Sequence, residues 1–232
     1  MKFKTQVIQT NYLSPSVKQI LFHRPPGFEF LAGQFVTVRF RNKFGKMIKR
    51  QYSISSAPTD FKFIELAVTL VKGGPCSTYL HNLKIGDEVE MIGPAGEFVL
   101  STIEGRYKKT FICTGTGVAP FRSMIWDVVP NNTNFIRLVA GYRCKEDALY
   151  HNEFESLSHQ YENFLYKLCL SRENNPEYPY KKERVTDWLK DEKVLMTSET
   201  YICGLDRMVT DVEKILLDKN CQPKDIYYER YD

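Results

Sequence analysis

The hydrophobic pattern of the chain changes near residue 105, and this change constrains the fold more than any other feature. From about residue 3 to residue 100, short β-rich segments alternate with turn sequences such as Gly73-Gly74-Pro75. This spacing predicts an amino-terminal antiparallel β-barrel or sandwich, with one short helix over residues 77–83. The expected strands cover residues 18–24, 34–40, 51–56, 63–71 and 87–93.

After Gly105 the pattern becomes strand, glycine-containing turn and helix, repeated four times and closed by a last strand. Such alternation predicts an α/β domain with a doubly wound parallel sheet. We therefore expect two domains, residues 1–105 and residues 106–232. The expected strand and turn segments are 110–120, 134–143, 162–172, 200–207 and 225–231, and the expected helices are 121–129, 152–161, 185–192 and 208–218.

Composition narrows the class of protein. Hydrophobic residues at 43% and charged residues at 26% are typical of a folded globular chain, and a net charge of +4 without long runs of one sign does not indicate nucleic-acid binding. Neither a secretory signal nor an 18-residue apolar run is present, so we expect a cytoplasmic protein that does not enter a membrane. The six cysteines form no CxxC pair, which predicts reduced thiols, mostly buried, and no metal site. A monomer is expected.

The glycine turn "GTGVAP" at residues 115–120 follows an apolar strand and precedes a helix. Glycines let a backbone approach an anion, and a helix N-terminus directs free N–H groups towards it, so a pyrophosphate fits. Pro120 suits the first helical turn. The third glycine of the full dinucleotide fingerprint is missing, however, and so is the acidic residue about 20 positions later. The motif alone is equally compatible with a plain strand-to-helix turn.

The ends of the following strands carry further polar residues. Ligands of parallel sheets bind at the carboxyl ends of strands, where this chain has Arg143, Ser171, Arg172 and Cys203. Two arginines and a serine near one sugar favour a 2′-phosphate, because guanidinium groups bind phosphate oxygens bidentately. The alternative is that the arginines are solvated surface charges.

The stretch "KRQYSISSAP" at residues 49–58 places a cation, a phenol and a hydroxyl close together. Strand alternation puts Arg50 and Tyr52 on one face and Ser53 on the other. Together with "GGPCSTYL" at 73–80, "GTGVAP" at 115–120, "CG" at 203–204 and the terminal "YYERYD", this stretch resembles the ferredoxin-NADP reductase family in order and spacing.

The resemblance implies that the amino-terminal barrel binds FAD and the α/β domain binds NADP(H). By this resemblance Arg50 pairs with the flavin pyrophosphate, Tyr52 packs against the isoalloxazine, and Ser53 lies near flavin N5. The second flavin segment would contribute Gly74, Cys76 and Ser77 to the pyrophosphate site. Without the resemblance, Cys76 is a buried thiol and Ser77 a helix cap.

For the second domain, the resemblance implies a nucleotide site and part of the catalytic site. Cys203 would lie beside the nicotinamide and place its C4 over flavin N5, a geometric role, since hydride transfer needs no covalent intermediate. Glu229 would join a proton network with Ser53, and Tyr231 would stack on the flavin, although Asp232 follows it here. The implied nucleotide contacts are Gly115, Thr116, Gly117, Pro120, Arg143, Ser171, Arg172 and Arg184.

These inferences predict an FAD-dependent oxidoreductase that exchanges a hydride between NADPH and flavin and passes single electrons to ferredoxin or flavodoxin. Two enzymatic alternatives are an NADH-dependent oxygenase reductase component and a free flavin reductase. An alternative of another class is a flavin-binding electron-transfer subunit that does not turn over outside a larger complex.

Overall fold

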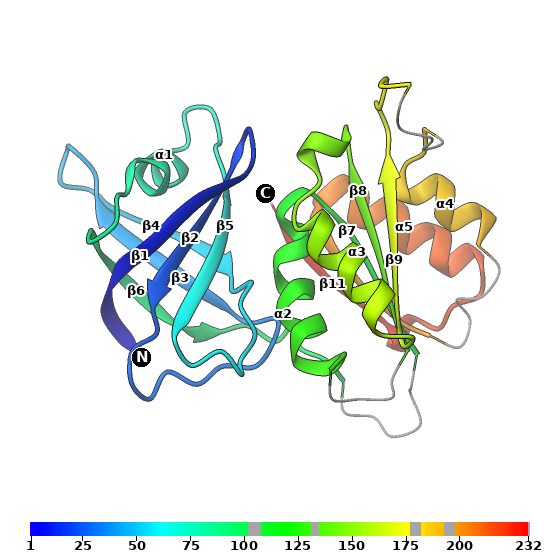
Figure 1. The fold of residues 1–232 in the computed structure, drawn as a ribbon, viewed down its shortest axis with the longest axis horizontal. Helices are drawn as coiled ribbons and strands as arrows, with labels where there is room; N and C mark the ends of the chain where they lie inside the picture. The colour runs from blue at the N-terminus through cyan, green and yellow to red at the C-terminus, as the bar shows by residue number, and fades with distance from the viewer. Residues whose placement is uncertain (102–107, 131–134, 177–181, 193–197, 232) are drawn as a thin grey trace. The chain divides into compact units, whose positions relative to one another are not determined.

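The structure, a computed structural model, consists of two compact units (Figure 1). One unit contains residues 1–100 and 119–127, and the other contains residues 101–118 and 128–232. The expected domain boundary between residues 105 and 106 falls in a segment outside the described residues. The structure describes residues 1–101, 108–130, 135–176, 182–192 and 198–231.

The first unit is built on a six-stranded antiparallel sheet with the strand order β4-β3-β6-β1-β2-β5. The two outer strands, β4 and β5, are joined by contacts just beyond the end of β4. Ile54 forms a bridge with Leu66, and the Ser55 N–H donates to the Glu65 carbonyl at 2.9 Å. This closure confirms the antiparallel barrel that the sequence predicts. The strands are β1 (Lys2–Ser14), β2 (Val17–His23), β3 (Phe35–Arg41), β4 (Met47–Ser53), β5 (Phe63–Thr69) and β6 (Glu88–Ala95).

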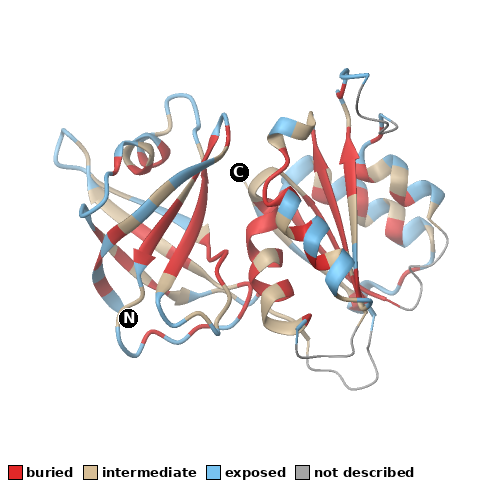
Figure 2. Ribbon diagram, viewed as in Figure 1, coloured by how far each residue is buried: buried red, intermediate tan, exposed pale blue. Residues whose placement is uncertain are grey.

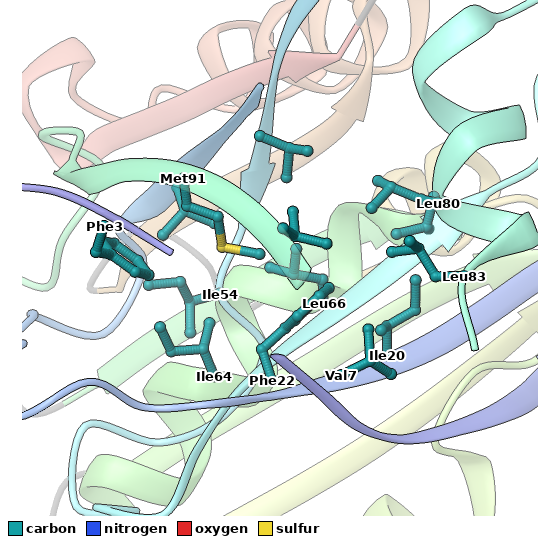
Figure 3. Packing of buried hydrophobic residues seen from close by; sticks show 14 of the residues in the cluster. Phe3, Val7, Ile20, Phe22, Ile54, Ile64, Leu66, Leu80, Leu83 and Met91 are labelled. Atoms are coloured by element: carbon teal, nitrogen blue, oxygen red, sulfur yellow. The ribbon is translucent and has the colours of Figure 1, made fainter. Parts of the chain in front are cut away.

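Alternating apolar residues fill the barrel (Figure 3). Phe22 and Leu66 are fully buried, and the helix α1 (Pro75–Asn82) adds Leu80 from one end. Burial of a side chain of this size stabilises the fold by about 1.5–3 kcal/mol. The strand β1 was not among the predicted strands, and β4 begins and ends earlier than residues 51–56.

The helix α2 (Val118–Val128) contributes residues 119–127 to this first unit. The rings of Phe121 and Phe98 lie 5.8 Å apart. One guanidinium nitrogen of Arg122 donates to the Ser55 carbonyl at 2.8 Å and lies 3.2 Å from the Glu65 carboxylate. Glu65 is only 2% exposed, and Arg122 compensates the charge of this buried carboxylate within the same unit.

The second unit is built on a five-stranded parallel sheet with the strand order β11-β10-β7-β8-β9. Its central strands are buried (Figure 2). The helix α3 packs against β9 through Phe154 and Tyr166, while α4 and α5 cover Ile112 and Val139 on the other face. This arrangement confirms the doubly wound α/β domain. The elements are β7 (Lys108–Thr114), β8 (Phe135–Tyr142), α3 (His151–Gln160), β9 (Phe164–Leu170), α4 (Val185–Asp191), β10 (Glu199–Leu205), α5 (Asp206–Asp218) and β11 (Ile226–Tyr231).

Three short 3₁₀ turns, η1 (Gly115–Gly117), η2 (Lys145–Asp147) and η3 (Pro223–Asp225), connect these elements. The parallel register aligns Cys203 with Cys113 on one side and with Glu229 on the other. The carboxyl ends of β7, β10 and β11 therefore lie at one edge of the sheet. In the part of the chain that the structure describes, no helix is both long and apolar enough to cross a membrane.

Candidate functional site

Strand β4 presents its polar side chains as the alternation predicts. Arg50 lies opposite Val38 and Tyr52 opposite Val36, so both side chains share one face of the sheet, while Ser53 lies on the other face. Arg50 is exposed, Tyr52 is half-buried and Ser53 is buried. One short strand thus offers a solvated cation beside a largely desolvated phenol.

The Tyr52 hydroxyl forms a hydrogen bond with the Cys76 sulfur at the start of α1. Burial raises the pKa of both groups above their ordinary values, so the phenol and the thiol are neutral at physiological pH. The positive charge of Arg50 lowers both pKa values by a smaller amount, which places the guanidinium close to both groups. The structure therefore brings Arg50, Tyr52 and Cys76 together.

The N-terminus of α1 completes this group. Gly74 occupies the N-cap position without a side-chain cap, Pro75 follows it, and the first turn carries no acidic residue. The Ser77 hydroxyl accepts from the Val71 N–H at 3.1 Å and donates to the Gly74 carbonyl at 3.1 Å, so it stabilises the turn itself. First-turn N–H groups without intrahelical acceptors next to Arg50 fit an anionic group such as the pyrophosphate of FAD.

The glycine turn of the second unit is packed tightly against β10. A Cβ atom on Gly117 would lie 2.2 Å from the Cys203 carbonyl oxygen, so only glycine fits there. Gly115 has a φ of 56°, in the left-handed region that favours glycine. Thr116 lies between them in η1, and Pro120 is the third residue of α2. These constraints hold the turn at the carboxyl end of β7, next to Cys203.

Cys203, Glu229 and Tyr231 form a cluster at the ends of β10 and β11. The Tyr231 hydroxyl forms a hydrogen bond with the Cys203 sulfur, and the Glu229 carboxylate lies close enough to interact with the thiol. Cys203 is fully buried, and this burial raises the pKa of its thiol well above the ordinary value. A neutral buried thiol is not poised for nucleophilic attack.

Arg143 and Arg172 lie side by side at the ends of β8 and β9. The Ser171 N–H donates to the Tyr142 carbonyl at 3.0 Å, and the Arg172 N–H donates to the Arg143 carbonyl at 2.8 Å. Both arginines are exposed to solvent. The Ser171 hydroxyl is engaged within the protein, because it donates to the Tyr142 carbonyl at 3.3 Å. The structure thus pairs the backbones of the two predicted arginines at one sheet edge.

The segment before α4 returns to the same edge. The Glu183 N–H donates to the Leu170 carbonyl at 3.0 Å, and Arg184 then occupies the N-cap position of α4, exposed to solvent. The neighbouring Glu173, which no sequence motif indicates, is 8% exposed and accepts three backbone hydrogen bonds in this region. The only signal was its position directly after Arg172.

Family models match both units separately. The oxidoreductase FAD-binding domain matches residues 4–100, and the oxidoreductase NAD-binding domain matches residues 111–214. Ferredoxin–NADP reductase B from Sorangium cellulosum is 33% identical over 99% of this chain and 98% of its own length. The chain belongs to the ferredoxin-NADP reductase family. It is therefore an oxidoreductase whose cofactors are FAD and a nicotinamide nucleotide.

Relatives within this family include both stand-alone reductases and reductase components of larger enzyme systems. The phenol hydroxylase P5 protein of Acinetobacter pittii is 30% identical over 99% of this chain, but the chain spans only 65% of it. A ferredoxin NADP⁺ reductase structure from Neisseria gonorrhoeae, with FAD and NADP bound, shares the fold at a TM-score of 0.84 and 23% identity, covering 99% of this chain and 98% of the other.

Proposed function

We propose that this member of the family oxidises or reduces NADP(H) in preference to NAD(H) and passes single electrons to a small acidic carrier such as ferredoxin or flavodoxin. The observation that supports NADPH most directly is the pair of exposed arginines, Arg143 and Arg172, joined through their backbones at 2.8 Å. Two guanidinium groups at one strand edge suit a 2′-phosphate dianion, which NADH lacks.

Bound FAD would supply the redox chemistry, since a flavin accepts two electrons together and releases them one at a time. The residues of the chain would bind and orient. Arg50 and the first turn of α1 would hold the pyrophosphate, while Tyr52, tied to Cys76, would present its ring to the flavin. In the second unit, the neutral Cys203 would fix the nicotinamide, and the nearby Glu229 would hold a proton.

The acceptor is inferred from charge. The hairpin between β3 and β4 and the strand that follows carry five basic side chains and no acidic one over residues 41–53. Phe44, at the tip of this hairpin, is 81% exposed. A basic surface with an exposed aromatic ring favours encounter with an acidic protein. Of these five, Arg50 is assigned to the pyrophosphate, so the basic residues left for the carrier are Arg41, Lys43, Lys46 and Lys49.

The nucleotide preference can be tested by rapid anaerobic mixing of the yellow holoenzyme with NADPH or NADH. We expect NADPH to bleach the flavin band much faster. Arg172→Ala should weaken the apparent affinity for NADPH by about 1.5–3 kcal/mol, the usual scale of a charged hydrogen bond, with little effect on NADH. Arg207→Ala, which removes an arginine whose side chain is 91% exposed, is the matched control. Equal bleaching by both nucleotides would contradict the NADPH assignment.

A second candidate is the reductase component of an oxygenase, because the phenol hydroxylase P5 protein is 30% identical over 99% of this chain. This candidate predicts equal or faster reduction by NADH and electron delivery to an oxygenase subunit. The same mixing experiment separates the two candidates. Identification of the endogenous carrier that reoxidises the reduced enzyme would then settle the acceptor.

A further inference from the structure

Glu173 is a buried carboxylate that joins two loops at the end of the parallel sheet. One carboxylate oxygen, Oε2, accepts from the Lys145 N–H at 2.9 Å. The other, Oε1, accepts from the N–H groups of Asn174 and Asn175 at 2.9 and 2.8 Å. Lys145 begins η2 after β8, whereas the two asparagines follow β9. A single side chain therefore fastens the β8–α3 loop to the loop after β9.

These two loops are the ones that carry the paired arginines. Arg143 lies two residues before Lys145, and Arg172 directly precedes Glu173. We call the three backbone hydrogen bonds of Glu173 the clasp. Next to it, the Arg172 N–H donates to the Arg143 carbonyl, and the Cys144 sulfur lies 3.7 Å from the Arg172 carbonyl oxygen. The Glu173 contacts therefore hold together the same two loops that this backbone hydrogen bond joins.

A carboxylate beside a phosphate site would ordinarily repel the ligand. Here the carboxylate accepts three backbone N–H groups and is 8% exposed. These hydrogen bonds hold the pKa of Glu173 below its ordinary value, and the N–H groups of Asn175 and Lys145 lower it most. Its charge is thus satisfied by the backbone, which leaves both guanidinium groups exposed at the edge.

We propose that Glu173 is a positioning residue for nucleotide selectivity, which sets the spacing of Arg143 and Arg172 so that both guanidinium groups reach one 2′-phosphate. This inference rests on the proposed preference for NADPH. It predicts that loss of the clasp weakens binding of a 2′-phosphorylated nucleotide much more than binding of the same nucleotide without that phosphate.

Two substitutions open the clasp from opposite sides. Glu173→Gln preserves volume but replaces one oxygen by an NH₂ group, so either Lys145 or the two asparagines lose their acceptor. Lys145→Pro removes the N–H donor and leaves the carboxylate intact, and the extended Cys144 (φ −129°, ψ 165°) tolerates a following proline. Lys145→Ala, which keeps the N–H, is the control for the proline. Glu183→Gln, at an equally buried carboxylate paired with Lys167, is the control for the glutamine.

The experiment measures binding of 2′-phospho-AMP and of 5′-AMP to the FAD-loaded full chain by calorimetry, and the KM and kcat for NADPH. We expect Glu173→Gln and Lys145→Pro each to weaken 2′-phospho-AMP at least fivefold and 5′-AMP less than twofold. The loss should appear in the KM for NADPH rather than in kcat. Both control variants should stay within twofold of the wild type.

Each outcome decides between the inferences. If the wild type binds 2′-phospho-AMP and 5′-AMP equally, the NADPH preference fails, and the role of Glu173 fails with it. If the wild type discriminates but both clasp variants discriminate equally well, only the role of Glu173 is overturned. If Glu173→Gln does not retain FAD and a native circular dichroism spectrum, Lys145→Pro against Lys145→Ala decides the question.

Discussion

At the scale of single residues, burial determines which thiol of this protein can react. All six cysteines are described, and Cys144 is the one that is not buried. Burial raises the pKa of Cys203 well above the ordinary value, so at pH 8 this thiol remains protonated, whereas a reactive thiol must be ionised. The Tyr231 hydrogen bond lowers the pKa by a smaller amount and does not offset burial.

We therefore expect iodoacetamide at pH 8 to alkylate the native protein once, at Cys144, as peptide mass spectrometry would show. Cys144→Ser should abolish this first modification, and modification of Cys203 should require unfolding. Rapid alkylation of Cys203 in the folded protein would contradict the purely geometric role that we propose for its thiol.

At the scale of elements, the helix α2 is held by a buried ion pair. Arg122→Ala would leave Glu65, which is 2% exposed, as a buried charge without its cation. Removing one partner of a buried pair costs about 3–5 kcal/mol, so the first unit should unfold at clearly lower urea. Lys4→Ala is the control, because the Lys4–Glu88 pair is exposed to solvent and contributes little to stability. Equal losses in both variants would contradict this account.

The same elements show what sequence can and cannot predict. The two sheets and the motifs around Arg50 and Gly115 could be predicted because hydrophobic period and turn chemistry are local signals. The Arg122–Glu65 and Glu173–Lys145 contacts join residues that are 57 and 28 positions apart in the sequence, so no local sequence pattern predicts them. β1 was missed although Phe3, Thr5 and Val7 alternate on its buried face, because polar residues interrupt its apolar character.

At the scale of the whole molecule, the net charge of +4 is small, so the proposed acidic carrier would be recognised through the local arrangement of charge. Charges at an interface steer encounter mainly through the association rate, and salt screens them over about 8–10 Å at physiological ionic strength. Among the described segments, the hairpin tip at Lys43 and Lys46 combines exposed cations with the exposed ring of Phe44.

We therefore expect the double variant Lys43→Glu/Lys46→Glu to slow reduction of an acidic flavodoxin by about tenfold at low salt, a typical size for lost electrostatic steering. Lys214→Glu/Lys224→Glu changes the net charge equally at exposed positions of α5 and η3, and should slow it less than twofold. Stopped-flow measurement at several salt concentrations should show the reduction rates of the two variants becoming equal as salt rises. Screening removes the electrostatic attraction that distinguishes them. A similar loss in both double variants would mean that net charge, rather than the hairpin, governs encounter with the carrier.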